Sequence, residues 1–179
     1  KNLNDRQVAE LLARADFRAP ENAWGESATE HTKEAFAMHC FLLFSSKFPK
    51  NLRAWIDQAD KSLGNIALLM LRQGVSRAIF ELEVDQIELS QYSWKTDDFN
   101  IFIYRNTKEI YAVFSQDDTC IEVALQVPEN YPVNLIDVEL SKEARLPKAK
   151  TQKYVLQIKK LLTTQNFSII EALMHWKHN

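Results

Sequence analysis

Hydrophobic and polar residues follow two different periodicities along this chain. Apolar positions recur at helical spacing up to about residue 91, alternate with polar ones between Phe99 and Leu140, and return to helical spacing after Lys148. A spacing near 3.6 residues marks one face of a helix, whereas strict alternation marks a half-buried strand. The pattern therefore predicts helices, then a sheet, then two further helices.

Short helices joined by short turns are predicted for the first part of the chain. Asn4 or Asp5 suits the cap of a first helix, because a short polar side chain can accept from the first free backbone N–H groups. The stretch Ser27-Ala28-Thr29-Glu30 has the spacing of a capping box and is expected to open a second helix. Pro49 is expected to end that helix.

The next helix carries one apolar stripe, formed by Leu52, Trp55, Ile56 and Ala59. Trp55 is therefore predicted to be a core residue. Gly64 is expected to interrupt the helical pattern, and a third pattern runs up to Gly74. One period does not establish a repeat, but residues 1–76 are interpreted as a HEAT-like helical segment, the end of a helical-repeat array.

Residues 77–91 suit either a strand or a helix. Phe80, Leu82 and Val84 alternate like a strand, whereas Leu82 and Ile87 also fit one face of a helix. No turn residue divides the segment into pieces of strand length, so a helix is predicted here.

Four strands are predicted between residues 99 and 140. Apolar and polar positions alternate in runs over 99–103, 110–114, 121–127 and 136–140. Asn106-Thr107 and Asp117-Asp118 are turn residues, with Asn106 able to adopt a left-handed backbone, and the loops have hairpin length. The sheet is therefore predicted to be an antiparallel four-strand meander.

The turn before the fourth strand contains two prolines and a tyrosine. Pro128 and Pro132 fix φ and lack the backbone N–H, so the hydrogen-bond ladder of neither strand can continue through them. Tyr131 adds a large apolar ring. Pro128, Tyr131 and Pro132 are therefore predicted to build a stiff structural turn.

Two amphipathic helices are predicted after the sheet. Residues 148–163 carry a continuous apolar face, and Ser168 with Glu171 forms a second capping box that opens the last helix. Trp176 lies on the apolar face of that last helix and is predicted to be buried. The order of helix, four strands and two helices indicates an α+β layer, with the helices on one face of the sheet.

Composition narrows the classes of function. The chain has 179 residues and 46% hydrophobic content, enough for one large domain or two small ones. No apolar run approaches the roughly 20 residues that span a bilayer, and the first residues do not resemble a signal peptide. Two cysteines separated by 79 residues form no disulfide framework, so a reducing cytosol is expected. Three glycines are too few for a glycine-rich phosphate loop.

No side chain is predicted to be catalytic, and no metal site is predicted. No motif places a base near Cys120, so that cysteine is interpreted as a small structural residue of a strand, and Cys40 as one of a helix's apolar stripe. His175 and His178 lie three residues apart, but two ligands are an incomplete zinc site. They are predicted to be solvated near the C-terminus of a helix, where positive charge suits the helix dipole.

A basic run is the strongest functional candidate among the residues. Residues 142–160 contain seven basic residues and one acidic residue, a local charge of +6 in a chain of net charge −2. Acidic residues concentrate instead at 81–88 and 97–98, where they are expected to favour solubility. One patch that binds the phosphates of a polyanion is expected from Lys142, Arg145, Lys148, Lys150 and Lys153. A solvated lysine-rich helix face fits the same residues equally well.

A helix, a four-strand meander, a Tyr-Pro turn and two closing helices together resemble an RWD domain, a relative of the ubiquitin-conjugating fold that lacks its chemistry. The resemblance assigns residues 77–179 to this domain. Three stretches are also similar to the listerin family of RING-type ubiquitin ligases: Phe48–Trp55, Val127–Pro132 and Gln165–Lys177. One position departs from the RWD pattern, since Ile136 stands where a further proline is usual.

The resemblance implies a non-catalytic docking and scaffold region of a ubiquitin ligase that marks stalled nascent chains for degradation. Its implied partners are the large ribosomal subunit near the nascent-chain exit, through ribosomal proteins, ribosomal RNA or both, and nascent-chain quality-control factors of the cytosol. The resemblance implies that a RING follows Asn179. The zinc ions and the ubiquitin-conjugating enzyme are expected to bind to that RING and not to these residues. No cofactor and no membrane contact are therefore expected for these residues.

Two other functions compete with this interpretation. The first is a generic RWD protein–protein interaction module without ribosome contact, which would bind through a surface insensitive to salt. The second is a ubiquitin-conjugating enzyme. The resemblance disfavours the second, because the cysteine of conjugating enzymes follows the Tyr-Pro turn and no cysteine follows Tyr131 in this chain.

Overall fold

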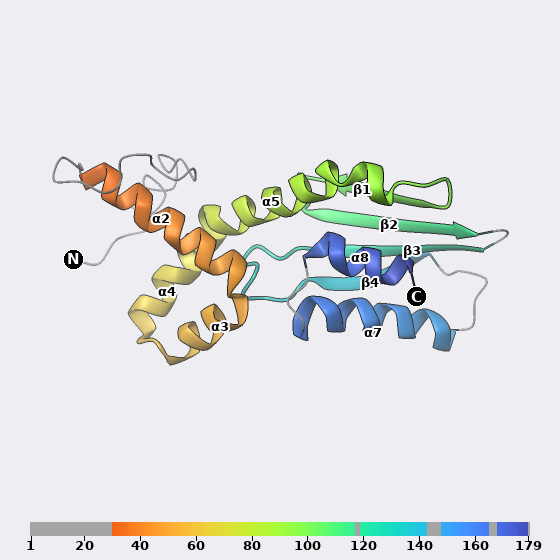
Figure 1. Cartoon of the computed structure of the whole chain (residues 1–179). Coiled ribbons are helices and arrows are strands. Elements are labelled where there is room, and N and C mark those ends of the chain that lie inside the picture. Colours follow the sequence, from red (N-terminus) through yellow and green to blue (C-terminus); the bar gives the residue numbers. More distant parts are fainter. Residues whose placement is uncertain (1–29, 117–118, 143–147, 165–167, 179) are drawn as a thin grey trace. The chain divides into compact units, whose positions relative to one another are not determined.

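The computed structural model describes residues 30–116, 119–142, 148–164 and 168–178 (Figure 1). The predicted caps at Asn4 or Asp5 and at Ser27, and the predicted turn at Asp117-Asp118, lie outside these residues. The chain divides into two compact units. A helical unit extends to Ile79 and includes Glu129–Val133, and a sheet unit comprises Phe80–Pro128 and the chain from Asn134 onward.

The helical unit contains α2 (Glu30–Lys47), α3 (Pro49–Gln58) and α4 (Lys61–Met70), followed by a π-helical turn η1 (Leu71–Val75) that leads into α5 (Ser76–Leu89). Pro49 stands at the first position of α3, where its missing N–H costs no intrahelical hydrogen bond. Asp60 caps α4 by accepting from the backbone N–H of Ser62 and Leu63 at 2.9 and 3.1 Å.

The prediction that glycine interrupts the helical pattern is wrong. Gly64 lies inside α4 and is buried, and Gly74 lies inside the π-helical turn that joins α4 to α5. A glycine weakens a helix by only about 1 kcal/mol relative to alanine, so packing of the neighbouring turns is sufficient to keep the helix continuous. The helix predicted for residues 77–91 is present as α5.

A hydrophobic cluster forms the core of the described part of the helical unit. Its buried members come from α2, α3 and the region from η1 into α5, and they are Met38, Leu42, Leu52, Leu71, Val75 and Ile79. Two residues of the proline turn, Tyr131 and Val133, pack against this cluster and are half-buried. The core is therefore completed by a turn that lies more than fifty residues further along the chain.

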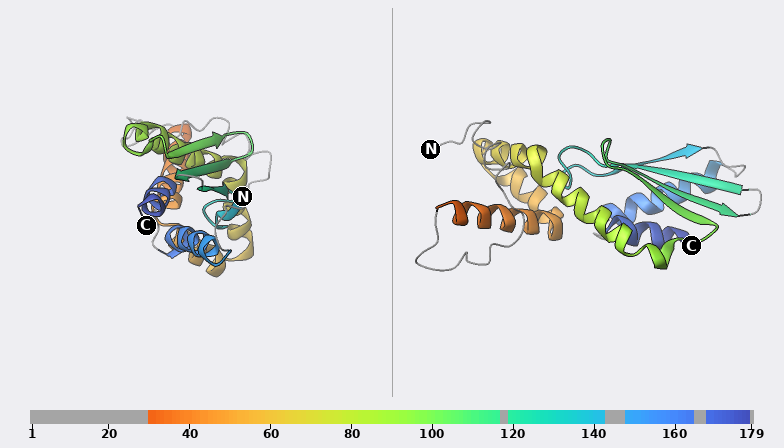
Figure 2. Two further views of the ribbon diagram at one scale, coloured as in Figure 1. Left: turned by 90° about the vertical axis from the view of Figure 1, so that its right-hand side faces the viewer. Right: turned by 90° about the horizontal axis from the view of Figure 1, so that it is seen from above.

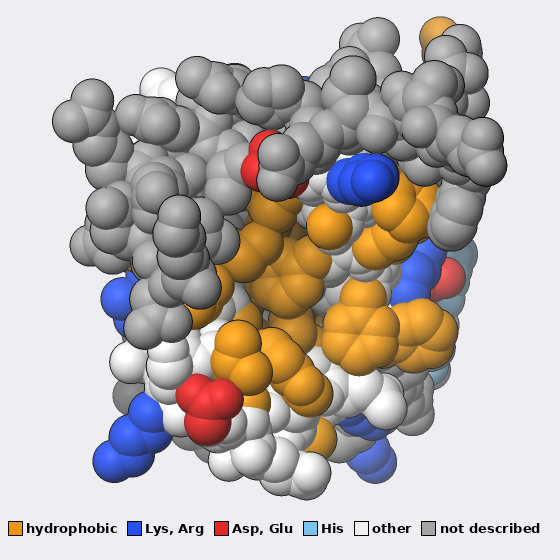
Figure 3. All heavy atoms as spheres, turned by 90° about the vertical axis from the view of Figure 1, so that its left-hand side faces the viewer, with side chains coloured by type: hydrophobic (Ala, Val, Ile, Leu, Met, Phe, Trp, Pro, Cys, Tyr) orange, Lys and Arg blue, Asp and Glu red, His pale blue; other side chains and the backbone are white. Residues whose placement is uncertain are grey.

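The prediction that Trp55 belongs to the core is wrong, because 44% of its surface is exposed. Leu52 and Ile56, four residues apart on α3, take the places that face the cluster, and Trp55 projects from the side of the helix. Large hydrophobic residues remain exposed elsewhere in this unit, and Figure 3 shows hydrophobic side chains gathered on one face. The exposed residues are Leu43, Phe44, Phe48, Trp55 and Leu63.

The sheet unit contains the predicted antiparallel meander, with strand order β1-β2-β3-β4. Its strands are β1 (Phe99–Tyr104), β2 (Glu109–Gln116), β3 (Thr119–Gln126) and β4 (Asp137–Lys142). The left-handed residue of the first turn is Lys108 rather than Asn106. A register shift next to Val123 marks a bulge between β3 and β4.

The short helix α6 (Gln91–Trp94) precedes the sheet, and α7 (Lys148–Thr164) and α8 (Ile169–Lys177) follow it. Figure 2 shows α7 and α8 on one side of the sheet, as predicted. The alternate strand residues that face them are buried, among them Phe99, Ile110, Val123 and Val138. Trp176 of α8 is only 5% exposed and contacts the rings of Phe99 and Phe114, which confirms its predicted burial.

Both ends of α8 are tied to the earlier part of the sheet unit. The predicted capping box is present, with Ser168 N–H donating to Glu171 at 2.8 Å. The Glu83 carboxylate of α5 accepts from the Ile169 N–H at 2.9 Å. At the other end the Lys177 ammonium donates to the carbonyl oxygen of Trp94 and the hydroxyl of Thr96, both at 3.0 Å. The acidic Glu83 at the N-terminus of α8 and the basic Lys177 at its C-terminus each have the charge that the helix dipole favours.

No helix within the described parts of the chain is long and apolar enough to cross a membrane.

Candidate functional site

The predicted basic patch lies along the exit from β4 and the start of α7. Lys142 is the last residue of β4, and Lys148 and Lys150 lie in the first turn of α7. The side chain of Lys153 is exposed on the same helix. Arg145 and the side chains of Lys142, Lys148 and Lys150 lie outside the described residues, so the patch itself stays a prediction.

Another lysine of the basic run, Lys159, is engaged inside the sheet unit. Its ammonium donates to the carboxylate of Asp137 at 2.9 Å. This hydrogen bond is the main cause that lowers the pKa of Asp137 below its ordinary value. The pair links the middle of α7 to the first residue of β4, so Lys159 has a structural contact that the sequence did not indicate.

The Tyr-Pro turn connects β3 to β4. Pro132 is buried, Pro128 and Tyr131 are half-buried, and the Val133 N–H donates to the Asn130 carbonyl oxygen at 2.9 Å. Because the Tyr131 ring packs against the core of the helical unit, its contacts there are those of a structural residue.

Both cysteines differ from the prediction, since each is exposed rather than packed. Cys120 lies on β3 opposite Ser115, and its thiol is 3.5 Å from that hydroxyl. A serine hydroxyl is not a base that can generate a thiolate, so this contact does not activate the sulfur. The alternation of β3 places Cys120 outward because Ile121 and Val123 face the core.

His175 of α8 and His178 at its C-cap are exposed, as predicted. His175 lies 3.3 Å from the Gln157 amide, and His178 follows the last turn of the helix. The described residues include no group of three or more His, Cys, Asp or Glu side chains that could hold a metal ion.

The sheet face opposite α7 and α8 carries an arrangement of side chains that the sequence analysis missed. Strand register places Phe102, Tyr111, Ala124 and Glu139 in one row across all four strands. Phe102 is 46% exposed, and the neighbouring Tyr104 is 54% exposed. The Tyr104 and Tyr111 rings meet edge to face, with centroids 5.4 Å apart. The outward face of β1 and β2 is therefore aromatic.

Carboxylates border this aromatic surface. Glu109, Tyr111, Ala124 and Glu139 line a hollow of about 260 Å³, together with Leu125, Gln126 and Asp137. The negative charge of Glu109 is the main cause that raises the pKa of Tyr111, followed by partial desolvation. The hollow is thus a site of negative potential beside an aromatic ring. Alternation identifies Glu109, Tyr111, Ala124 and Glu139 as outward, but only the register shows that they are neighbours.

Comparison with known proteins gives two results. Residues 99–179 match the family model described as "Ubiquitin conjugating domain-like". Eight curated relatives match the chain, and each is named "E3 ubiquitin-protein ligase listerin". The relative from Xenopus tropicalis is 31% identical over 131 residues, which are 73% of this chain and 8% of that protein.

More distant relatives match over more of the chain. The listerin of Drosophila melanogaster is 25% identical over 160 residues, 89% of this chain and 9% of that protein. The listerin of Saccharomyces cerevisiae is 21% identical over 175 residues, 97% of this chain and 11% of that protein. The chain is therefore related to the listerins. It spans about a tenth of the length of the listerins that it matches.

The relation to the listerins agrees with the structure at the level of the sheet unit. The meander and its two closing helices occupy the residues that match the conjugating-domain-like family. The listerin matches extend beyond that unit, since the alignment with the yeast protein covers nearly the whole chain. The helical unit is therefore part of what this chain shares with the listerins.

Proposed function

We propose that this chain is a docking and scaffold region of a ubiquitin ligase, which positions the ligase on large ribosomal subunits that carry stalled nascent chains. The observation that carries the proposal is the set of eight matches, all to proteins named E3 ubiquitin-protein ligase listerin. In this proposal a RING elsewhere in the protein transfers ubiquitin, and these residues contribute binding.

The separation of charge supports a polyanionic partner for one surface. Residues 142–160 carry a charge of +6, whereas the whole chain has a net charge of −2. Lysines in the first turn of α7 oppose the helix dipole, at a cost of about 0.3–1 kcal/mol for each exposed charge. Contacts with the phosphates of ribosomal RNA would offset that cost by releasing condensed counterions.

Co-sedimentation of the chain with purified large ribosomal subunits, across a salt titration, tests the proposal. Five phosphate contacts predict a slope of log affinity against log salt of about −3.5 to −4.5. The double variant Lys148→Glu with Lys150→Glu should bind more weakly and with a shallower slope. The control is Lys61→Glu with Lys95→Glu, which changes the net charge equally at two exposed lysines outside the run.

The two variants separate the possible results. Binding that both variants weaken equally would reflect net charge alone and would contradict docking through the basic run. Binding that does not respond to salt or to either variant would favour the generic interaction module instead. Failure of the parent chain to co-sediment at low salt would refute docking by this region.

A further inference from the structure

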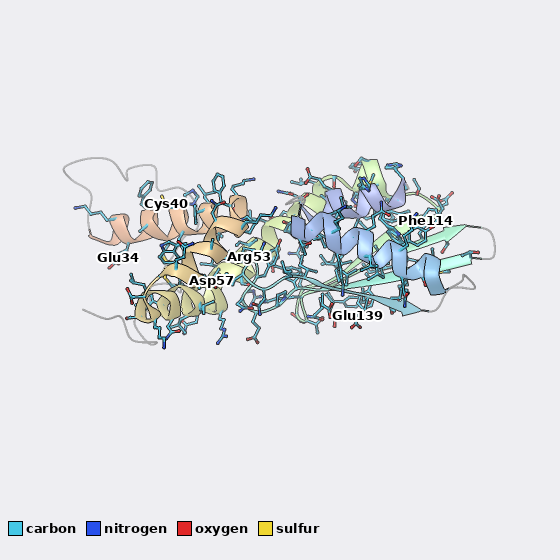
Figure 4. All side chains as sticks on the ribbon, turned by 90° about the horizontal axis from the view of Figure 1, so that it is seen from below. Glu34, Cys40, Arg53, Asp57, Phe114 and Glu139 are labelled. Carbon is cyan, nitrogen blue, oxygen red and sulfur yellow. The ribbon has the colours of Figure 1, made fainter. Side chains whose placement is uncertain are left out.

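The outward face of the four-stranded sheet is uncovered within the described residues, because α7 and α8 lie against the other face. Figure 4 shows the contrast through two labelled residues: Phe114 lies on the side of these helices and Glu139 on the opposite side. An isolated exposed aromatic residue needs no explanation. Here Phe102, Tyr104 and Tyr111 are neighbours, and a continuous aromatic surface is uncommon on a face that meets only water.

The charged side chains that line the hollow are the carboxylates of Glu109, Asp137 and Glu139, and Lys142 lies opposite Glu122 further along β4. Glu109, Glu122 and Glu139 point outward from β2, β3 and β4. Asp137 lies at the start of β4 and forms the ion pair with Lys159 described above. Among the outward strand positions whose side chains are described, none is lysine or arginine. The hollow therefore attracts a cationic group and repels phosphate.

We propose that the uncovered sheet face docks an arginine-rich polypeptide segment, with one guanidinium seated in the hollow above Ala124 and against the Tyr111 ring. The small Ala124 side chain forms the floor of the hollow. The carboxylates of Glu109 and Glu139 stand at its sides and accept the guanidinium N–H groups.

The geometry favours arginine over lysine. A planar guanidinium stacks on an aromatic ring and donates to two carboxylates at once, whereas an ammonium is a compact, strongly hydrated charge. The pKa of Tyr111, raised chiefly by Glu109, shows that negative potential reaches the ring. The apolar rings of Phe102 and Tyr104 extend the surface beyond one side chain, so a polypeptide segment suits the face better than a free small cation.

A second copy of the same face is a poor occupant. A two-fold contact would place the carboxylates of Glu109, Glu122 and Glu139 against those of the partner face. Like charges in direct opposition across such a contact cost free energy. This inference does not depend on ribosome docking, which we assigned to the basic run on β4 and α7.

Fluorescence anisotropy with a labelled peptide of four Arg-Gly repeats tests the inference on the whole chain. The parent should bind this peptide more tightly than a matched peptide of four Lys-Gly repeats. Glu109→Gln with Glu139→Gln should weaken the arginine peptide about two- to thirtyfold, the range expected for two exposed ion pairs. Tyr111→Leu should weaken it about two- to fivefold through loss of the cation–π contact.

The matched control is Asp85→Asn with Asp97→Asn, which removes two exposed acidic charges elsewhere in the sheet unit. This control should change the affinity less than about twofold, since only distant, screened charges are lost. Amide chemical-shift changes on peptide addition should centre on Phe102, Tyr111, Ala124 and Glu139. Equal weakening by both double variants, equal affinity for the two peptides, or shifts centred elsewhere would overturn the proposal. Tighter association of the chain with itself or with a single-stranded nucleic acid at this face would also overturn it.

Discussion

Replacement of Trp176 by alanine should destabilise the sheet unit more than any exposed aromatic substitution in it. The Trp176 ring is almost completely buried and contacts Phe99 and Phe114, with ring centroids 6.0 and 6.4 Å away. Truncation of a buried tryptophan to alanine costs about 3–5 kcal/mol, from lost transfer free energy and from the cavity that remains. The two edge-to-face contacts contribute about 0.5–1.5 kcal/mol each to that range.

Native-state hydrogen exchange is the suitable measurement, because the two units need not unfold together. A loss of 3–5 kcal/mol, at about 1.4 kcal/mol for each factor of ten, predicts that protected amides of β1, β2 and β3 exchange about 10²- to 10⁴-fold faster. Trp176→Phe keeps an aromatic ring in the same place and should show a smaller acceleration.

The control for this experiment is Tyr92→Ala, since Tyr92 is fully exposed in the same unit. Its strand amides should exchange at the parent's rate. The argument from burial would be refuted if Trp176→Ala left the exchange of Ile110 and Val123 within about threefold of the parent, because core burial predicts at least a hundredfold change.

Two further substitutions test local features. Gly64→Ala should raise the free energy of unfolding by about 0.5–1 kcal/mol, measured by urea denaturation, because the added Cβ would lie 3.5 Å from the Ile56 carbonyl oxygen, an ordinary contact. A loss of stability would show that α3 cannot accommodate the methyl group. Asp137→Asn should cost about 0.2–1 kcal/mol at neutral pH, because its exposed pair with Lys159 is lost. The pair lowers the pKa of Asp137 in the folded state, so its contribution to stability is present above the ordinary pKa and is lost as the pH falls through the folded-state pKa. The free energies of unfolding of the parent and the variant should therefore converge in acid. A difference between them that stays constant with pH would contradict the assignment.

Alternation along the chain predicted the sheet correctly because each strand has one buried face. Phe99, Ile110, Val123 and Val138 occupy the positions that period-two spacing assigns to the core. The capping box of α8 was also predictable from the sequence, because Ser168 and Glu171 each accept a hydrogen bond from the other's backbone N–H and need no distant residue.

Features that depend on contacts distant in sequence were less predictable. The stripe on α3 contains both Leu52 and Trp55, and only the position of the neighbouring helices decides that Leu52 faces the core. Gly64 resembles a helix breaker locally, but α4 continues through it. Propensity is a weak determinant where tertiary packing acts on the same residues.

The two candidate sites differ in the same way. The basic run is contiguous in sequence, so composition alone identified Lys148 and Lys150. The hollow on the sheet joins Glu109 and Glu139 from two strands that are not neighbours in the sheet order. Its recognition required strand register, which hydrophobic alternation does not specify for outward residues.

The ties at both ends of α8 have a consequence for the order in which the sheet unit assembles. Glu83 and Trp94 lie more than eighty residues before their partners on this helix, so two long loops must close before the contacts form. During synthesis the meander emerges first, with the surface around Phe99 still lacking Trp176. The unit therefore reaches its full stability only after α8 has been made, and until then it exposes an apolar sheet face that is prone to aggregation.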